Sequence, residues 1–127
     1  AALTVFLVED NPLIRAQLVP ALEELAHAEI LGTAEAEDEA VDWLARHRGE
    51  WRLAVVDFFL TRGNGLGVVC WALGRDPRQK VAVLTNFATP DTRERCLTAG
   101  ADAVFDKSTE LDQFFTFCRE FSAPVDD

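Results

Sequence analysis

Short, continuously apolar runs alternate along the chain with segments whose apolar residues recur at helical spacing. The continuous runs contain Val, Leu, Ile or Phe and are bounded by turn residues, a pattern typical of strands buried on both faces of a parallel sheet. Five such runs are present: Leu3–Val8, Ile30–Thr33, Leu53–Val56, Val81–Thr85 and Ala103–Phe105. The pattern therefore predicts five parallel strands.

A helix is predicted after each of these strands, because apolar residues recur there three or four positions apart. The residues that define the five helices are Ile14, Leu18, Leu22 and Leu25; Ala40, Val41 and Leu44; Leu66–Leu73; Thr92–Ala99; and Leu111, Phe114, Phe115 and Cys118. Asn11 is expected to cap the first helix, and Pro12 suits its first turn. Pro20 lies inside this helix and is expected to kink it, whereas Gly100 is expected to end the fourth.

Strands that alternate with helices predict an α/β domain with right-handed crossovers. We expect a doubly wound, five-stranded parallel sheet of the flavodoxin-like kind, with strand order 2-1-3-4-5 and five helices. The 127 residues suit one such domain. We place it at residues 1–121, followed by a C-terminal tail or the start of a linker at residues 122–127. Methionine is absent even at position 1, so we expect a trimmed or rebuilt N-terminus, in a domain that either stands alone or is excised from a longer protein.

Charge and hydropathy exclude several classes of protein. The net charge is −10, and no stretch of clustered Lys or Arg offers the basic face that nucleic acid needs. No apolar run reaches the roughly 18 residues that span a bilayer, and no signal peptide opens the chain. The three cysteines, Cys70, Cys96 and Cys118, form no CxxC pair. We expect buried, reduced thiols and a cytoplasmic location, without membrane or direct nucleic acid contact.

Polar residues follow four of the predicted strands. They are Glu9 and Asp10 after the first strand, Asp57 after the third, Thr85 at the end of the fourth, and Asp106 and Lys107 after the fifth. The carboxyl ends of adjacent parallel strands meet at one edge of a sheet, so these side chains should converge. Crowded carboxylates repel one another unless a cation joins them. Their hard oxygens predict a site for Mg²⁺ (or Mn²⁺).

This set of groups suits phosphoryl transfer to a carboxylate. Asp57 is the expected nucleophile because its strand is central in the sheet. Glu9 and Asp10 would hold the metal, and Lys107 would pair with the phosphoryl oxygens as negative charge builds on them. The hydroxyl of Thr85 would donate a hydrogen bond to one of those oxygens.

The ordered set of motifs resembles the receiver domain of bacterial two-component response regulators, of the chemotaxis-regulator kind. Its parts are Val8-Glu9-Asp10-Asn11, Val56-Asp57 with Gly65-Leu66 after it, Leu84-Thr85, and Phe105-Asp106-Lys107. The resemblance covers essentially the whole chain. It implies that Asp57 is the phosphoacceptor and that the backbone carbonyl of Phe59 is a metal ligand beside Glu9, Asp10 and Asp57. It also implies that Thr85 and Phe105 move on activation, although an aromatic in a last strand also suits a plain core.

Partners are implied in the same way. The phosphoryl group would come from a histidine kinase or a histidine phosphotransfer protein, with the receiver's own metal site assisting both phosphorylation and dephosphorylation. The chain is thus expected to be a phosphoacceptor in a phosphorelay, not an enzyme with a separate substrate. A face made of the fourth helix, fifth strand and fifth helix would then change and control a downstream protein, an output domain or a homodimer.

Three residues depart from the family pattern. Ser108 replaces the proline that usually follows the lysine, so we expect a trans peptide bond where the family has a cis bond. Thr61 replaces another usual proline and should leave the loop after Asp57 less constrained. Asn86 replaces a usual Ala or Gly. Together with the bulky Phe59, at a position that tunes phosphoryl lifetime in the family, it is expected to alter autodephosphorylation.

The fold expected from the sequence also suits three other functions. A degenerate receiver that binds proteins independently of phosphorylation is the main alternative, and the retained acidic residues and lysine count against it. A phosphatase that forms an aspartyl phosphate normally needs a second acid two residues after the nucleophile, where Phe59 stands. A flavodoxin-like nucleotide binder needs a Gly-rich loop after the first strand, where the chain has Glu9 and Asp10.

The last predicted helix carries more phenylalanines than one core-facing stripe needs. Phe117 and Phe121 widen the stripe sideways. Either they form an exposed apolar patch that binds a partner, or this helix is more deeply buried than the others. The sequence leaves both interpretations open.

Overall fold

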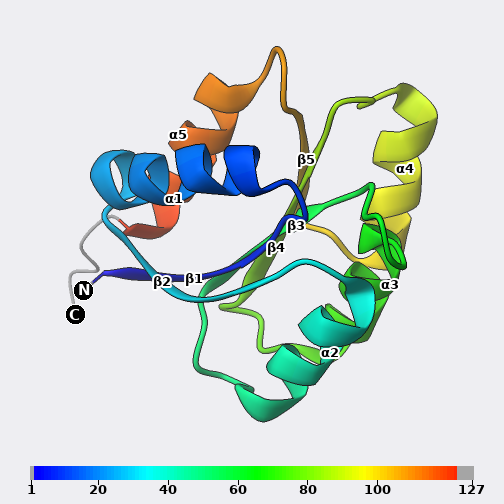
Figure 1. Ribbon diagram of the computed structural model, residues 1–127, viewed down its shortest axis with the longest axis horizontal. Coiled ribbons are helices and arrows are strands. Elements are labelled where there is room, and N and C mark those ends of the chain that lie inside the picture. Colours follow the sequence, from blue (N-terminus) through cyan, green and yellow to red (C-terminus); the bar gives the residue numbers. More distant parts are fainter. Residues whose placement is uncertain (1, 123–127) are drawn as a thin grey trace.

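The apolar runs form a parallel, five-stranded sheet in the computed structural model, which describes residues 2–122 (Figure 1). The strands are β1 (Leu3–Val8), β2 (Ala28–Ala34), β3 (Leu53–Asp57), β4 (Lys80–Thr85) and β5 (Ala103–Asp106). Their order is β2-β1-β3-β4-β5, and all four neighbouring pairs are parallel. This arrangement confirms the predicted fold class. Strand β2 is longer than its apolar run because it lies at an edge, where most of its residues are half-buried or exposed.

Five helices cover the two faces of the sheet. They are α1 (Pro12–Ala26), α2 (Glu37–Arg46), α3 (Gly65–Trp71), α4 (Pro90–Ala99) and α5 (Leu111–Ser122), and a 3₁₀ turn, η1 (Ala72–Gly74), follows α3. Figure 1 shows α1 and α5 on one face and α2, α3 and α4 on the other. Each face therefore has its own hydrophobic core, with β3 buried along its whole length between them.

Local signals set the helix ends. The Asn11 side chain accepts hydrogen bonds from the first turn of α1, as predicted, and α1 continues past Pro20 to Ala26. Gly100 ends α4 with a φ of 116°, a backbone conformation that glycine adopts without steric cost. Helix α4 begins two residues before the predicted start, because Thr89 caps it and accepts a hydrogen bond from the backbone N–H of Thr92.

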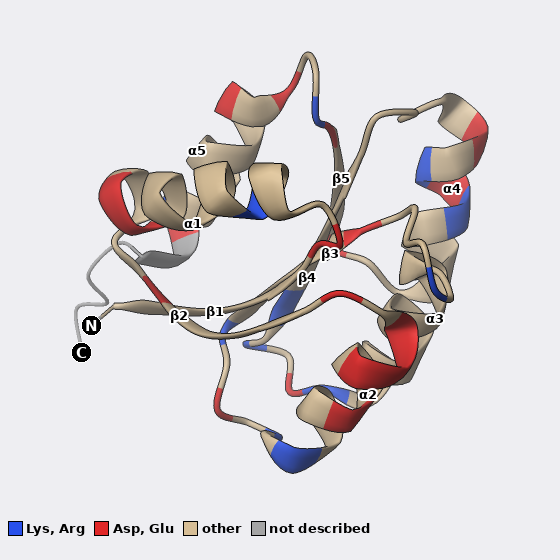
Figure 2. Ribbon diagram, viewed as in Figure 1, with Lys and Arg blue, Asp and Glu red and all other residues tan. Residues whose placement is uncertain are grey.

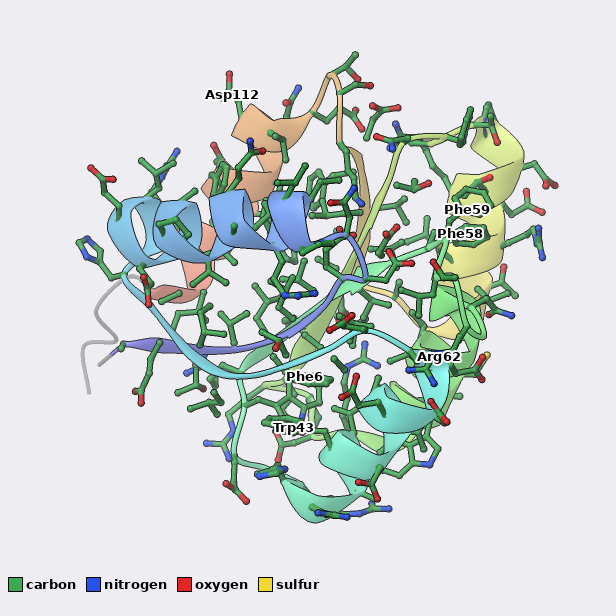
Figure 3. The ribbon with its side chains drawn as sticks, viewed as in Figure 1. Phe6, Trp43, Phe58, Phe59, Arg62 and Asp112 are labelled. Atoms are coloured by element: carbon green, nitrogen blue, oxygen red, sulfur yellow. The ribbon has the colours of Figure 1, made fainter. Side chains whose placement is uncertain are left out.

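The core beneath α2 is organised around aromatic rings. Phe6 of β1 and Trp43 of α2 stack face to face, with ring centroids 4.0 Å apart (Figure 3). One prediction about packing is wrong: Cys96 and Cys118 are buried, but Cys70 is exposed. Helix α3 turns this residue to solvent while its neighbours Val68 and Val69 pack in the core. All three thiols are free.

Helix α5 packs more deeply than a single stripe would require. Phe114, Phe115 and Cys118 are buried. Phe117 is half-buried and lies against Phe105 of β5, with ring centroids 5.5 Å apart. The described side chains therefore favour burial over an exposed patch on this helix.

The predicted tail lies largely outside the described residues. Helix α5 includes Ser122, its last residue, and the side chain of Phe121 and residues 123–127 are outside the part of the chain that the structure describes. The boundary at 121 stays a prediction. Within the described residues, no helix combines the length and apolar character needed to cross a bilayer.

Candidate metal centre

Three carboxylates meet at the carboxyl edge of the sheet. Glu9 and Asp10 directly follow β1, and Asp57 ends the neighbouring strand β3. One ligand oxygen from each lies within 4.8 Å of the others. Figure 2 shows acidic segments coming together beside the end of β3. The convergence that strand order predicts is therefore present, and the donor set fits a hard divalent cation, which prefers carboxylate oxygens.

Lys107 joins two of these carboxylates. Its Nζ atom lies 2.7 Å from Oε1 of Glu9 and 3.1 Å from Oδ2 of Asp57. Its backbone N–H donates to the carbonyl of Thr85, which fixes the end of β5 against β4. All three charged side chains are at most 9% exposed. One ammonium thus faces two buried carboxylates, and the cluster keeps a net negative charge that a cation would balance.

The environment of Asp57 favours its protonated form. Burial raises its pKa most, the charge of Lys107 lowers it, and the charge of Glu9 raises it again, giving a pKa of about 7. The cause is that a desolvated carboxylate beside another carboxylate is costly to ionise. A group with such a perturbed pKa at the end of a central strand is a candidate for chemistry.

The stability of the metal-free protein should therefore fall as pH rises from about 4 to about 7, between the ordinary and the folded pKa of Asp57. Asp57 has a pKa of about 7 when folded and an ordinary value of 3.8, so the folded chain binds more protons in this window. Its contribution to the free energy of unfolding then falls by up to about 1.4 kcal/mol per pH unit. Urea unfolding in the presence of EDTA would measure this slope. The Asp57→Asn variant should lose it, and equal slopes for both proteins would contradict the assignment.

Asp10 lies on the more open side of the cluster. Its Oδ2 atom accepts hydrogen bonds from the backbone N–H of Thr61, at 2.7 Å, and from the Thr61 hydroxyl, at 2.5 Å. Burial acts to raise the pKa of Asp10, but these two bonds outweigh it and hold the pKa below its ordinary value. Asp10 is therefore kept ionised for a metal more readily than Asp57.

The remaining predicted residues surround the cluster. Thr85 is fully buried, and its Oγ1 accepts a hydrogen bond from the backbone N–H of Phe87 at 3.1 Å. Phe59 follows Asp57 by two residues, and its N–H donates to Oδ1 of Asp57 at 3.2 Å. Its ring is exposed beside Phe87, 5.8 Å away, and Figure 3 shows it next to Phe58. Phe105 is half-buried against α5.

The turn after Lys107 is built without proline. Among the described residues no peptide bond is cis, which confirms the trans bond expected before Ser108. Oδ1 of Asp106 accepts hydrogen bonds from the N–H and hydroxyl of Ser108 and from the N–H of Thr109. Asp106 therefore shapes the turn, and Lys107 is left to pair with Glu9 and Asp57.

Sequence reasoning missed two residues that hold the loop after β3. In the sequence Thr61 is recognisable only as a departure from the family pattern, whereas in the structure it donates two hydrogen bonds to Asp10. Glu37, at the start of α2, accepts a hydrogen bond from the N–H of Asn64 at 2.9 Å. Its carboxylate fills the space where Gly63 and Gly67 lack a side chain. Gly63 and Gly67 indicate in the sequence that another group packs closely against this loop, but nothing in the sequence identifies that group as Glu37.

Gly65 is required where the loop returns to the strand. A Cβ atom there would lie 2.1 Å from the carbonyl oxygen of Asp57. Gly65→Ala should therefore destabilise the fold by about 2 kcal/mol, because backbone must move to relieve the overlap. Urea unfolding would measure it. Gly74→Ala is the matched control, since nothing lies within 4 Å of its Cβ position, and an equal effect of the two substitutions would contradict the steric argument.

Comparison with known proteins identifies one family. The family model for the response regulator receiver domain matches residues 5–119. Comparison with curated proteins gave no match. Among solved structures, a two-component response regulator of the LuxR family from Aurantimonas sp. SI85-9A1 is 17% identical with a TM-score of 0.84, covering 97% of this chain and 86% of that one.

Two further solved structures are of phosphorylated proteins. The phosphorylated cyanobacterial phytochrome response regulator RcpA is 26% identical with a TM-score of 0.71, covering 94% of this chain and 91% of its own. A response regulator protein from Burkholderia pseudomallei, with a phosphorylated aspartic acid, calcium ion and citrate, is 20% identical with a TM-score of 0.79. That match covers 95% of this chain and 69% of the other.

Proposed function

This chain belongs to the response regulator receiver domain family, and on that basis we propose that it is a phosphorylation-activated switch whose acceptor is Asp57. The phosphoryl group would come from the phosphohistidine of a histidine kinase or a histidine phosphotransfer protein in a cytoplasmic phosphorelay. The observation that carries the proposal is the buried cluster in which Lys107 contacts both Glu9 and Asp57, with Asp10 beside them.

Each residue of the cluster has its own role in the proposed phosphoryl transfer to Asp57. An oxygen of Asp57 forms the new O–P bond while the P–N bond to the donor histidine breaks. Lys107, already 3.1 Å from Asp57, would pair with a phosphoryl oxygen. The carboxylates of Glu9, Asp10 and Asp57 and the carbonyl of Phe59 would hold Mg²⁺ or Mn²⁺, which when bound neutralises negative charge on the transferring group.

A link from the site to the α4-β5-α5 face supports the switching part of the proposal. Arg93 of α4 donates to the carbonyl of Val104 in β5 at 3.1 Å and to Oε1 of Glu110 at 2.7 Å. The same Glu110 oxygen accepts from the N–H of Asp106. Movement of Thr85 toward the phosphoryl group, and of Phe105 with it, would therefore reach all three elements. We propose that this face meets a downstream protein, an output domain or a second receiver.

A degenerate receiver that binds proteins without phosphorylation is the competing function. Such a protein would not need the lysine to contact the acidic residues, because no phosphoryl group is transferred. The close Lys107–Glu9 and Lys107–Asp57 pairs favour a working acceptor instead. The same geometry leads us to propose a phosphoacceptor that assists its own reaction, since Phe59 stands at the position where a phosphatase that forms an aspartyl phosphate has its second acid.

Intact mass measurement after incubation with acetyl phosphate or phosphoramidate tests the proposal. We expect a single adduct with the mass of one phosphoryl group, formed with Mg²⁺, absent with EDTA and lost at alkaline pH. An adduct that forms equally well with EDTA would overturn the metal-dependent reaction. The lack of any adduct with every donor and metal would favour the degenerate module.

A further inference from the structure

Thr61 forms a bridge between the loop after β3 and Asp10 of the metal centre. It lies in the loop after β3, fifty-one positions along the chain from Asp10, and both of its donors reach the same Asp10 oxygen. The acceptor is charged and the two distances are short, 2.7 Å and 2.5 Å, as expected for charge-assisted hydrogen bonds. Thr61 itself is exposed, so these bonds do not arise from close packing around a buried side chain.

The bridge acts on a loop that is already held at its other end. Glu37 donates its backbone N–H to the carbonyl of Arg62 at 3.1 Å, and its side chain accepts from the N–H of Asn64 at 2.9 Å. Figure 3 shows Arg62 beside the start of α2. The segment from Phe59 to Asn64 is therefore fixed to α2 at one end and to the end of β1 at Thr61.

We propose that Thr61 is a positioning residue for the metal centre. By holding one oxygen of Asp10, it leaves the other oxygen to the cation and keeps Asp10 close to the loop that carries Phe59. Hydrogen bonds of this kind orient metal-binding carboxylates, and their loss typically weakens metal binding by about 10–100-fold. The inference rests on the proposed function, because it concerns the affinity of the same metal site.

The chemistry of the bridge identifies which substitutions test it. Valine has the shape of threonine but no hydroxyl, so Thr61→Val removes one of the two donors. Serine keeps both donors, so Thr61→Ser should restore the bridge. Thr116→Val is the matched control, since Thr116 is an exposed threonine on α5 whose hydroxyl, among the described residues, bonds to the Asp112 carbonyl and to Arg119 of the same helix.

Mn²⁺ binding, followed by the electron paramagnetic resonance signal of the free ion, measures affinity without phosphorylation. We expect Thr61→Val to weaken Mn²⁺ binding about 10-fold. Thr61→Ser and Thr116→Val should bind Mn²⁺ as the wild type does, and all variants should melt at similar temperatures. Wild-type affinity in Thr61→Val, or failure of Thr61→Ser to restore binding, would overturn the role of Thr61 alone. A wild-type protein that binds no Mn²⁺ would instead overturn the metal site on which the proposed function depends.

Discussion

Replacing Asp57 with asparagine should abolish formation of the phosphoryl adduct while leaving the fold intact. An amide has the shape of the carboxylate but no anionic oxygen to attack phosphorus. The neighbouring acids are poor substitutes, because Glu9 is held by Lys107 at 2.7 Å and Asp10 is held by Thr61. The variant should also be more stable than the wild type at neutral pH without metal, since a costly buried charge is removed.

Intact mass after incubation with acetyl phosphate and Mg²⁺ measures the loss, and urea unfolding measures the gain in stability. Asp112→Asn is the control, because Asp112 is an exposed carboxylate on α5, directed away from the sheet (Figure 3). Its adduct should equal that of the wild type. An adduct of normal amount on Asp57→Asn would assign the acceptor to another residue.

Replacing Lys107 with methionine should cost about 3–5 kcal/mol of stability in the metal-free protein at about pH 8. Methionine keeps much of the length and apolar contact of the lysine but not its charge. Glu9 and Asp57, which are 1% and 7% exposed, then lose the cation that both contact. Phosphorylation should slow as well, because no ammonium remains to pair with the transferred group.

Three comparisons make this second prediction specific. Lys80→Met controls for the change of residue type, since Lys80 is half-buried at the start of β4 and forms no ion pair within the described residues. Addition of Mg²⁺ should restore part of the stability lost by Lys107→Met. Combining that substitution with Asp57→Asn should cost less than Lys107→Met alone, because only one carboxylate then lacks a partner. A loss no greater than that of Lys80→Met would show that the buried cluster does not depend on its cation.

Much of the fold was predictable because its signals are local or follow from strand order. Buried parallel strands leave continuous apolar runs, and β3 is the clearest example, with every residue buried. The convergence of Glu9, Asp57 and Lys107 followed from placing their strands side by side. Strand β2 was underestimated because an edge strand need not be apolar throughout.

What could not be predicted depends on side chains that meet across the fold. The contact between Thr61 and Asp10 joins two loops and has no periodic signal in the sequence. The anchoring of Asn64 by Glu37 is of the same kind. Cys70 was misjudged because α3 is short and mostly apolar, so its outward positions carry no polar marker.

The pairing of Lys107 with Glu9 spans 98 positions of the chain, from the end of the first strand to the end of the last. During synthesis, Glu9 and Asp57 would therefore leave the ribosome long before Lys107, whose ammonium group contacts both of them. We expect this contact to form after the more local ones, because the entropy of closing a long loop must be overcome first. We therefore expect the proposed phosphoacceptor site to be complete only once the last strand is in place, so that a partly folded chain would not be phosphorylated.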